Sequence, residues 1–332
     1  MTLLGEKTSM TEDAILSDLL QACERYFRLK VLDASPIKIG YLNLKWKLTT
    51  DSGAYLLKQY NQKRLQLYDQ KALLEAFQLQ MKLYDSGLPC PKLHSYEGRY
   101  FLTSKKSELF LLMDYCDGEI VPPGKTNEAQ MFELGKTAGF MHHLLNEQGL
   151  RKTPQFIMPD KDDRLKHWRT LQHTAETARN DQQNAIFKKL HSVTSSIDWN
   201  EFVLGETGWS HRDLWMDNLL FDDKKLCAIL DFDRMKYDYP QLDAARAVIS
   251  GALDNGRLDV KRVRAFMEGY NIHCPMDEKK MVQSLKLLWL MESTWWITED
   301  MADHKGPPIR FAEEMLWLTD NFFQLEDVFK NT

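Results

Sequence analysis

The chain has 332 residues, of which 43% are hydrophobic and 27% are charged, a balance typical of globular proteins and sufficient for two lobes with separate cores. Lys plus Arg number 43 and Asp plus Glu number 48, which leaves a net charge of −5. Because no basic block stands out, the composition disfavours nucleic acid and anionic membranes as partners.

The cysteines indicate neither a disulfide framework nor a zinc site. They are odd in number, scattered, and contain no Cys-x-x-Cys pair. The first ten residues lack an apolar segment of signal-peptide length, and no later segment is apolar enough to span a bilayer. We therefore expect a cytoplasmic protein. The five cysteines are Cys23, Cys90, Cys116, Cys227 and Cys274.

The first third of the chain mixes helical and strand patterns. Apolar residues recur at helical spacing after Thr11, a suitable N-cap. Strict alternation then predicts strands with one buried face, the first pair joined by a turn at 51–53. The predicted elements are helix 11–30, strand 42–48, strand 54–60, helix 64–84, strand 99–103 and strand 108–115.

The rest of the chain is predicted to be mostly helical. Gly and Pro residues over 118–124 break the regular pattern, and we place a hinge between two lobes at 113–117. The predicted helices are 127–147, 162–195, 240–253, 259–270, 278–301 and 309–330.

The most informative motif is His-x-Asp-x-x-x-x-Asn, which runs from His211 to Asn218. A phosphoryl-transfer site needs one carboxylate that orients an attacking hydroxyl and accepts its proton. It also needs an amide oxygen and a second carboxylate that hold Mg²⁺ on nucleotide phosphates. Asp213 suits the first role, and Asn218 and Asp231 suit the second.

The spacing of Asn218 and Asp231 supports this interpretation. The intervening residues read as strand 219–221, turn 222–225 and strand 226–230. A hairpin would bring Asp231 back beside Asn218. The alternative is a polar loop whose Asp and Asn only cap turns, but the apolar strand with an acidic end favours the phosphoryl-transfer site.

With these motifs, which lie at about 208–246, the chain resembles the aminoglycoside phosphotransferase and choline kinase superfamily, in particular its homoserine-kinase-type or spore-coat-kinase-like branch. The resemblance covers most of the chain and implies a bilobal α+β fold like that of protein kinases. The N-lobe, 1–115, would be a small antiparallel sheet with one main helix. The C-lobe, 116–332, would be larger and mostly helical. ATP and Mg²⁺ are the implied cofactors.

The resemblance also implies the nucleotide contacts. Lys58, on the second predicted strand, corresponds to the lysine that contacts the α- and β-phosphates, and Glu75 corresponds to its helix partner. Gly-x-Gly-x-x-Gly is absent, but Gly40 followed by Asn43 fits the superfamily's shorter loop, whose N–H groups cradle phosphate. Backbone groups from Asp114 to Cys116 would pair with adenine.

Two further polar residues are implied to support the loop, and the role of a third, Asp233, is left open. His211 would pack against the backbone that carries Asp213 and hydrogen-bond to it. Asp243 would brace the loop by accepting backbone N–H groups. Asp233 shares a face with Asp231 if the strand continues, and would lie near a second metal or the acceptor, or bind only solvent.

The acceptor is expected to be a small molecule. His211, Arg212 and Asp213 form the His-Arg-Asp triplet of many protein kinases, but only eleven residues separate Asp231 from Asp243. That length leaves no room for an activation loop and a peptide platform.

Carboxylates and indoles near the C-terminus could bind an amine or quaternary ammonium acceptor by charge and cation–π attraction. An amphipathic helix with core Trp and rim Glu residues explains the same pattern equally well. The acceptor candidates are Glu292, Trp295, Trp296 and Glu299 of this predicted helix, where spacings of three and four place them on one stripe, and Trp215 of the motif loop.

Two hypotheses follow. The first is an ATP- and Mg²⁺-dependent kinase of a small hydroxyl-bearing metabolite, an amino alcohol or a sugar before an aminoglycoside, since a polycation pocket would need more acidic residues. The second is a catalytically idle kinase-fold protein that serves as a nucleotide-binding, coat or scaffold component. The single loop glycine favours the second, whereas the intact Lys58, Asp213, Asn218 and Asp231 favour the first.

Overall fold

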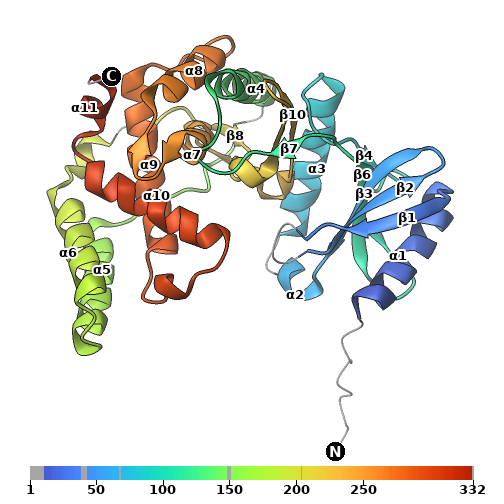
Figure 1. Cartoon of the computed structure of the whole chain (residues 1–332), viewed down its shortest axis with the longest axis horizontal. Coiled ribbons are helices and arrows are strands. Elements are labelled where there is room, and N and C mark those ends of the chain that lie inside the picture. The colour runs from blue at the N-terminus through green and yellow to red at the C-terminus, as the bar shows by residue number, and fades with distance from the viewer. Residues whose placement is uncertain (1–10, 39–42, 67–68, 148–150, 203, 331–332) are drawn as a thin grey trace, which may run out of the picture. The chain divides into compact units, whose positions relative to one another are not determined.

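The computed structural model describes residues 11–38, 43–66, 69–147, 151–202 and 204–330 (Figure 1). They form two compact units. Unit 1 comprises the described parts of 1–85 and 90–117, and unit 2 comprises 86–89 and the described residues from 118 onwards. Within these ranges no helix is both long and apolar enough to cross a membrane.

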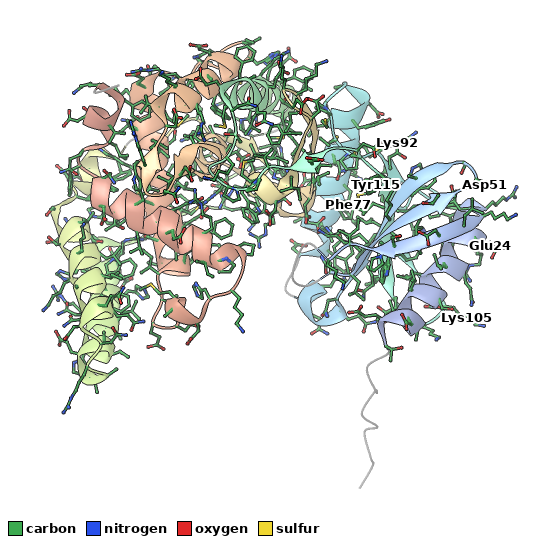
Figure 2. The ribbon with its side chains drawn as sticks, viewed as in Figure 1. Glu24, Asp51, Phe77, Lys92, Lys105 and Tyr115 are labelled. Atoms are coloured by element: carbon green, nitrogen blue, oxygen red, sulfur yellow. The ribbon has the colours of Figure 1, made fainter. Side chains whose placement is uncertain are left out.

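Unit 1 is built on an antiparallel six-stranded sheet, in agreement with the antiparallel sheet that the predicted α+β fold includes. The strand order is β1-β2-β3-β6-β4, and β5 pairs with β6. Thr50 pairs with Gly53 across the predicted turn between β2 and β3, and Asp51 lies at the tip of this hairpin (Figure 2). The strands are β1 Val31–Pro36, β2 Lys45–Thr50, β3 Gly53–Tyr60, β4 Leu93–His94, β5 Leu102–Thr103 and β6 Leu109–Asp114.

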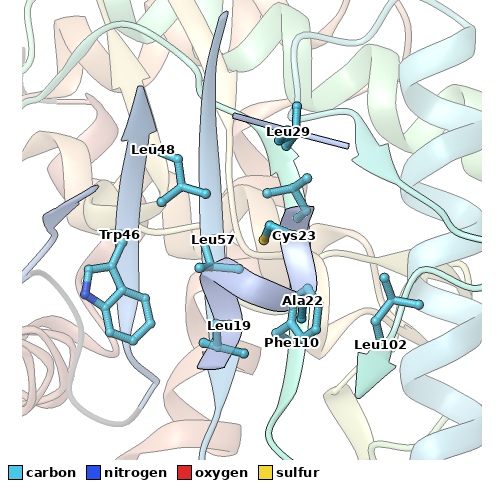
Figure 3. Close-up of a cluster of buried hydrophobic side chains, with 10 residues drawn as sticks. Leu19, Ala22, Cys23, Leu29, Trp46, Leu48, Leu57, Leu102 and Phe110 are labelled. Carbon is cyan, nitrogen blue, oxygen red and sulfur yellow. The ribbon is translucent and has the colours of Figure 1, made fainter. Parts of the chain in front are cut away.

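Two helices cover the two faces of this sheet (Figure 1). Helix α1, Glu12–Phe27, packs Leu19 and Cys23 onto Leu57 in one cluster (Figure 3). Helix α3, Gln70–Asp85, packs its own apolar residues onto Leu56 and Tyr60 in a second cluster. Because side chains alternate along a strand, the residue between Leu57 and Gln59, which is Lys58, projects from the α3 face.

Unit 1 differs from the predicted elements in one broken helix and two additional strands. Thr11 caps α1 as predicted, accepting the Ala14 N–H at 3.4 Å. The single helix predicted over 64–84 is wrong, because α2, Gln62–Leu65, ends before α3 begins. Asp69 starts the new helix by accepting the Lys71 N–H at 2.9 Å with its side chain. Strands β1 and β4 were not predicted.

Unit 2 is mostly helical. Together with the antiparallel sheet of unit 1, this confirms the predicted α+β class. Two predicted helices are in fact broken. The helix predicted over 162–195 ends at Thr177, since Arg179 adopts a left-handed backbone (φ 55°) and Asn180 caps the next helix. The helix predicted over 309–330 divides at 322–324. The helices are α4 Glu128–Asn146, α5 Lys161–Thr177, α6 Asp181–Ser196, α7 Gln241–Ala252, α8 Val260–Tyr270, α9 Glu278–Trp296, α10 Pro307–Asn321 and α11 Leu325–Lys330.

Short strands hold the motif region of unit 2 together. The predicted hairpin is present: β9, Leu219–Phe221, pairs antiparallel with β10, Leu226–Ile229, and β7, Glu119–Ile120, joins its other side. A second pair, β8 (Gly208–Ser210) and β11 (Lys236–Asp238), flanks the motif. The loop from Ser210 to Leu219 and the segment from Ile229 to Lys236 are therefore each anchored by strands at both ends.

Helices α4 and α8 approach each other unusually closely. A Cβ atom on Gly135 would lie 1.9 Å from the Phe266 carbonyl oxygen, and one on Gly269 would lie 2.0 Å from the Phe132 carbonyl oxygen. Only glycine leaves room for backbone contact at these positions. This contact brings the buried His142 of α4 beside Tyr270 of α8.

Candidate active site

Asp213 is held by the loop that follows β8. Arg212 has a left-handed backbone (φ 65°) that turns the chain. The Asn218 amide nitrogen donates to the Asp213 carbonyl oxygen at 2.8 Å and to its carboxylate at 3.1 Å. The five-residue step of the motif thus joins its two functional side chains directly, and the Asn218 amide oxygen remains as the ligand-type atom.

His211 links this loop to the end of β10. Its ring is fully buried. Nε2 donates to the Leu230 carbonyl oxygen at 3.0 Å, and Nδ1 accepts the Asp213 N–H at 3.3 Å. The imidazole is therefore a structural connector between the backbone of Asp213 and the residue that precedes Asp231, as the resemblance implies.

Asp231 returns beside Asn218, as the hairpin predicts. The Leu230 N–H donates to the Asn218 carbonyl oxygen at 2.8 Å. Asp231 itself adopts a left-handed backbone (φ 59°), and a 3₁₀ turn, Phe232–Arg234, follows it. The strand ends before Asp231, so the condition under which Asp233 would share a face with Asp231 is not met, and the role of Asp233 stays a prediction.

The surroundings of Asp213 disfavour its ionised form. Its side chain is 24% exposed. Burial raises the pKa of Asp213 above its ordinary value; the Arg234 guanidinium, 3.5 Å away, partly offsets this, and the negative charge of Asp231 adds to the rise. A raised pKa makes this carboxylate a stronger proton acceptor than an exposed aspartate.

Asp243, in the first turn of α7, braces the loop through the contacts that the resemblance implies. Its carboxylate accepts the His211 N–H at 2.5 Å and the Arg212 N–H at 2.8 Å. Burial alone would raise its pKa, but these bonds and the contact with His142 hold the pKa of Asp243 below its ordinary value. Asp243 is thus an ionised, buried anchor.

His142 completes the brace and was not predicted. Its Nε2 donates to Asp243 at 3.0 Å, and its Nδ1 accepts the Tyr270 hydroxyl at 2.7 Å. The signal in the sequence is a histidine on the apolar face of α4, which by itself indicates only a satisfied core residue.

The residues present fit a magnesium ion that also binds substrate phosphates. Asn218 and Asp231 offer oxygen ligands from neighbouring backbone positions, the donors that Mg²⁺ prefers. Among the described residues no group of three or more His, Cys, Asp and Glu residues is arranged to hold a metal alone. Mg²⁺ in phosphoryl-transfer sites is commonly held by one or two protein ligands plus phosphate oxygens.

The predicted nucleotide residues belong to unit 1. Lys58 is 3% exposed, and its Nζ lies 4.9 Å from the centre of the Tyr60 ring. It shares the α3 face of the sheet, and Glu75 belongs to α3; their pairing stays a prediction. Asn43 accepts the Asn61 N–H at 3.2 Å, whereas Gly40 lies outside the described residues.

The predicted adenine contacts lie at the end of β6. The Asp114 N–H donates to the Lys92 carbonyl oxygen at 2.9 Å, and the Asp114 carboxylate pairs with His94 at 2.6 Å. The Tyr115 N–H donates to the Ala54 carbonyl oxygen at 3.2 Å. These bonds hold the strand end in place, and base pairing by Asp114 and Cys116 stays a prediction.

The acceptor candidates separate into two groups. Trp215 and Trp296 both pack on Phe311, with ring centres 4.7 and 4.6 Å away, and the Trp296 indole N–H donates to Glu292 at 2.9 Å. Glu292 also pairs with the buried Arg246.

Trp295 and Glu299 lie apart from this group. Trp295 is 55% exposed. Helix α9 ends at Trp296 and not at 301 as predicted. Glu299 therefore lies beyond the helix, where it is exposed and does not share a helix face with Glu292 and Trp296.

Comparison with known proteins identifies the family of the chain. The model of the phosphotransferase enzyme family matches residues 33–273, so the chain belongs to that family. It is 24% identical over 269 residues to a homoserine kinase of Rhodopseudomonas palustris strain BisA53, covering 80% of this chain and 78% of the relative.

Solved structures agree on the fold. The microcompartment-associated aminopropanol kinase has a TM-score of 0.61 at 16% identity and covers 95% of this chain and 100% of its own. A spectinomycin phosphotransferase in complex with ADP and spectinomycin has a TM-score of 0.59 at 14% identity, covering 92% and 98%. The family model confirms the resemblance to the aminoglycoside phosphotransferase and choline kinase superfamily, and these structures agree with it in fold.

Proposed function

We propose that the protein transfers the γ-phosphate of ATP to a hydroxyl group of a small metabolite. The observation that carries the proposal is the arrangement of Asp213, Asn218 and Asp231: the first two are hydrogen-bonded, and the Leu230–Asn218 backbone bond joins the third to them. A proton-accepting carboxylate beside two metal-type oxygen ligands is the minimum that phosphoryl transfer requires.

Asp213 serves as the catalytic base. It orients the acceptor hydroxyl and accepts its proton while the hydroxyl oxygen forms a bond to the γ-phosphorus. The bond between that phosphorus and the oxygen bridging to the β-phosphate breaks, and ADP leaves. Asn218 and Asp231 would hold Mg²⁺, which neutralises charge on the phosphates when bound.

Lys58 contacts the nucleotide phosphates, with Glu75 as its partner, in this proposal. The Gly40–Asn43 loop cradles phosphate, and backbone groups near Asp114 and Cys116 take the base. Similar proteins solved with ADP and with a non-hydrolysable ATP analogue support a nucleotide substrate. The curated relatives named as homoserine kinases support a small hydroxyl-bearing acceptor, which favours the amino alcohol over the aminoglycoside.

The test is coupled ADP release with ATP and Mg²⁺ across amino alcohols, hydroxy amino acids, sugars and aminoglycosides. Asp231→Asn serves as the inactive blank. Asp223→Asn is its matched control, because it makes the same change on an exposed residue in the turn of the same hairpin. We expect one class of acceptor to raise ADP release in the wild type and the control but not in the blank.

Asp213→Asn should lower kcat by about 10²- to 10⁴-fold, with the Kd for nucleotide little changed. Wild-type turnover by this variant would show that Asp213 is not the base. Nucleotide binding without ADP release for any acceptor would instead support the idle kinase-fold hypothesis.

A further inference from the structure

A cavity of about 600 Å³ lies within unit 2, beside the loop from Ser210 to Leu219 that carries Asp213 and that we call the catalytic loop. Its size suits a small metabolite. The segment 155–159, the first turns of α5, strand β11 and the last turns of α9 form its wall. Arg212, the residue before Asp213, lines it directly, so the cavity begins one residue from the proposed catalytic base.

Arg164 is the unusual residue of this wall. Its guanidinium is buried, at 4% exposure, and packs on the Trp289 ring at 4.7 Å. Its terminal nitrogens donate to the Leu290 carbonyl oxygen at 2.8 Å and to the Ser293 hydroxyl. All of these partners are neutral. Buried charges in proteins are ordinarily paired with an opposite charge.

Arg164 has no such pair among the residues that the structure describes. No carboxylate there lies within 4 Å of it, and its buried Nε atom has no hydrogen-bond partner. One helical turn further, the buried Nε2 atom of His167 on the same wall also lacks a partner. Burial lowers the pKa of Arg164 to about 9, which still leaves it charged at neutral pH.

The other charges on the wall divide into paired and unpaired groups. Arg212 and Asp238 neutralise each other. Asp160 caps α5 by accepting N–H groups. Lys236 is exposed on the wall, and no carboxylate of the described chain lies within 4 Å of its ammonium group. Within the described part of the chain, Arg164 and Lys236 are therefore two cations without counter-ions in one cavity, and the exposed Asp163 adds a negative charge to its lining.

We propose that this cavity is the acceptor site and that the acceptor is a hydroxyl-bearing carboxylic acid, whose carboxylate binds Arg164 and Lys236. Asp163 is placed to receive an ammonium group, so a hydroxy amino acid satisfies all three side chains. Trp295 also lines the cavity and adds an apolar surface to it. This inference rests on the proposed kinase function, since it assigns the acceptor of the same site.

The other candidate acceptor group, around Glu292, already has its hydrogen-bond partners within the protein. The Glu292 carboxylate, the candidate for an amine acceptor, takes hydrogen bonds from Arg246 and Trp296. Glu292 thus has a counter-ion, whereas Arg164 has none among the residues that the structure describes. The uncompensated charge therefore predicts an anionic group on the acceptor, which homoserine has and 3-amino-1-propanol lacks.

Three probes separate these possibilities. L-Homoserine carries hydroxyl, ammonium and carboxylate groups, 4-hydroxybutyrate lacks the ammonium, and 3-amino-1-propanol lacks the carboxylate. Each would be measured by calorimetric binding to the full chain and by ADP release with ATP and Mg²⁺. Binding is read without turnover, so it tests the cavity even if the kinase proposal fails.

The variants are Arg164→Met, Lys236→Met and the control Arg169→Met. Arg169 lies on the same helix but is exposed and does not line the cavity. Lys236 is exposed, so its variant is expected to fold even if Arg164→Met does not; a thermal melt checks both. We expect each cavity variant to weaken homoserine and 4-hydroxybutyrate binding by about 10- to 100-fold, with Arg169→Met unchanged.

Loss of carboxylate binding in Lys236→Met or a folded Arg164→Met, with 3-amino-1-propanol binding unaffected, would support the assignment. Equal binding of homoserine and 3-amino-1-propanol to the wild type would overturn it, and so would failure of both carboxylates to bind. If carboxylates bind in this manner but no acceptor raises ADP release, the cavity assignment stands and the kinase proposal fails.

Discussion

Asp243→Asn is the sharpest test of how the fold holds the catalytic loop. The wild-type carboxylate is 1% exposed and accepts two backbone N–H groups and one imidazole N–H, at 2.5, 2.8 and 3.0 Å. The asparagine side chain has one acceptor oxygen, and its amide nitrogen would face a donor. At least one buried N–H would then lose its acceptor, together with the charge that His142 contacts.

The magnitude follows from these contacts. A hydrogen bond to a charged group contributes about 1.5–3 kcal/mol, and an unsatisfied buried donor costs about 1–3 kcal/mol. We therefore expect Asp243→Asn to lower the free energy of unfolding of unit 2 by about 2–5 kcal/mol, a large part of the 5–15 kcal/mol typical of a native protein. Loosening of the loop should also lower kcat by about 10- to 100-fold.

The assay is urea unfolding followed by circular dichroism, at several pH values. The pKa of folded Asp243 lies below its ordinary value of 3.8. Its contribution is therefore complete above pH 3.8 and is lost as pH falls through the lower, folded pKa. The difference between wild type and variant should shrink in acid. A change below 0.5 kcal/mol at pH 7, the ordinary range of an exposed substitution such as Asp223→Asn, would refute the brace.

Three further predictions follow from contacts within unit 2. Glu292→Gln should lower the free energy of unfolding by about 2–3 kcal/mol. The loss is somewhat smaller than for a buried pair that loses its only partner, because Glu314 still pairs with Arg246. A raised KM for the acceptor at unchanged stability would instead assign Glu292 to acceptor binding, and the exposed Glu299→Gln is the control. Gly135→Ala should lower the free energy of unfolding by about 1–3 kcal/mol, measured in a thermal or urea melt, because its Cβ would overlap the Phe266 carbonyl. Lys136→Ala changes an exposed residue on the same helix and should leave stability nearly unchanged. Equal melts of the two variants would contradict the close contact. Arg234→Met removes the cation that lowers the pKa of Asp213, so the acid limb of kcat/KM should move to higher pH; a limb that stays in place or moves down would argue against Asp213 as the titrating base.

The proximity of the proposed catalytic residues could be predicted from the sequence because they lie in two short segments. Asp213 and Asn218 share one loop, and the strand-turn-strand pattern returns Asp231 to it through a local hairpin. Helical and strand periodicity likewise located α1, β2, β3, α4, α7 and α8. In each case the information is carried by residues near one another in the chain.

The missed features depend on distant contacts or weak local signals. Strand β1 contains Asp33 and Pro36 and does not alternate clearly, so only its pairing with β2 defines it. The break after α5 occurs at Arg179, and arginine is not a residue type that predicts a left-handed turn. His142 and Arg164 acquire their roles from residues more than 90 positions away, which no local pattern can indicate.

The acceptor is the part of the function that the fold does not determine. Structures of this fold include an aminopropanol kinase and a spectinomycin phosphotransferase, so architecture alone is compatible with acceptors of different charge. The decisive observation is how each buried charge in unit 2 is compensated. Arg246 has the counter-ions Glu292 and Glu314, and the Asp243 carboxylate accepts three N–H groups. Arg164 has only neutral partners within the described chain, and it lines the cavity next to the catalytic loop. Since isolated buried charges are costly, a carboxylate that arrives with the acceptor would satisfy Arg164 in the complex and make binding selective for acidic acceptors.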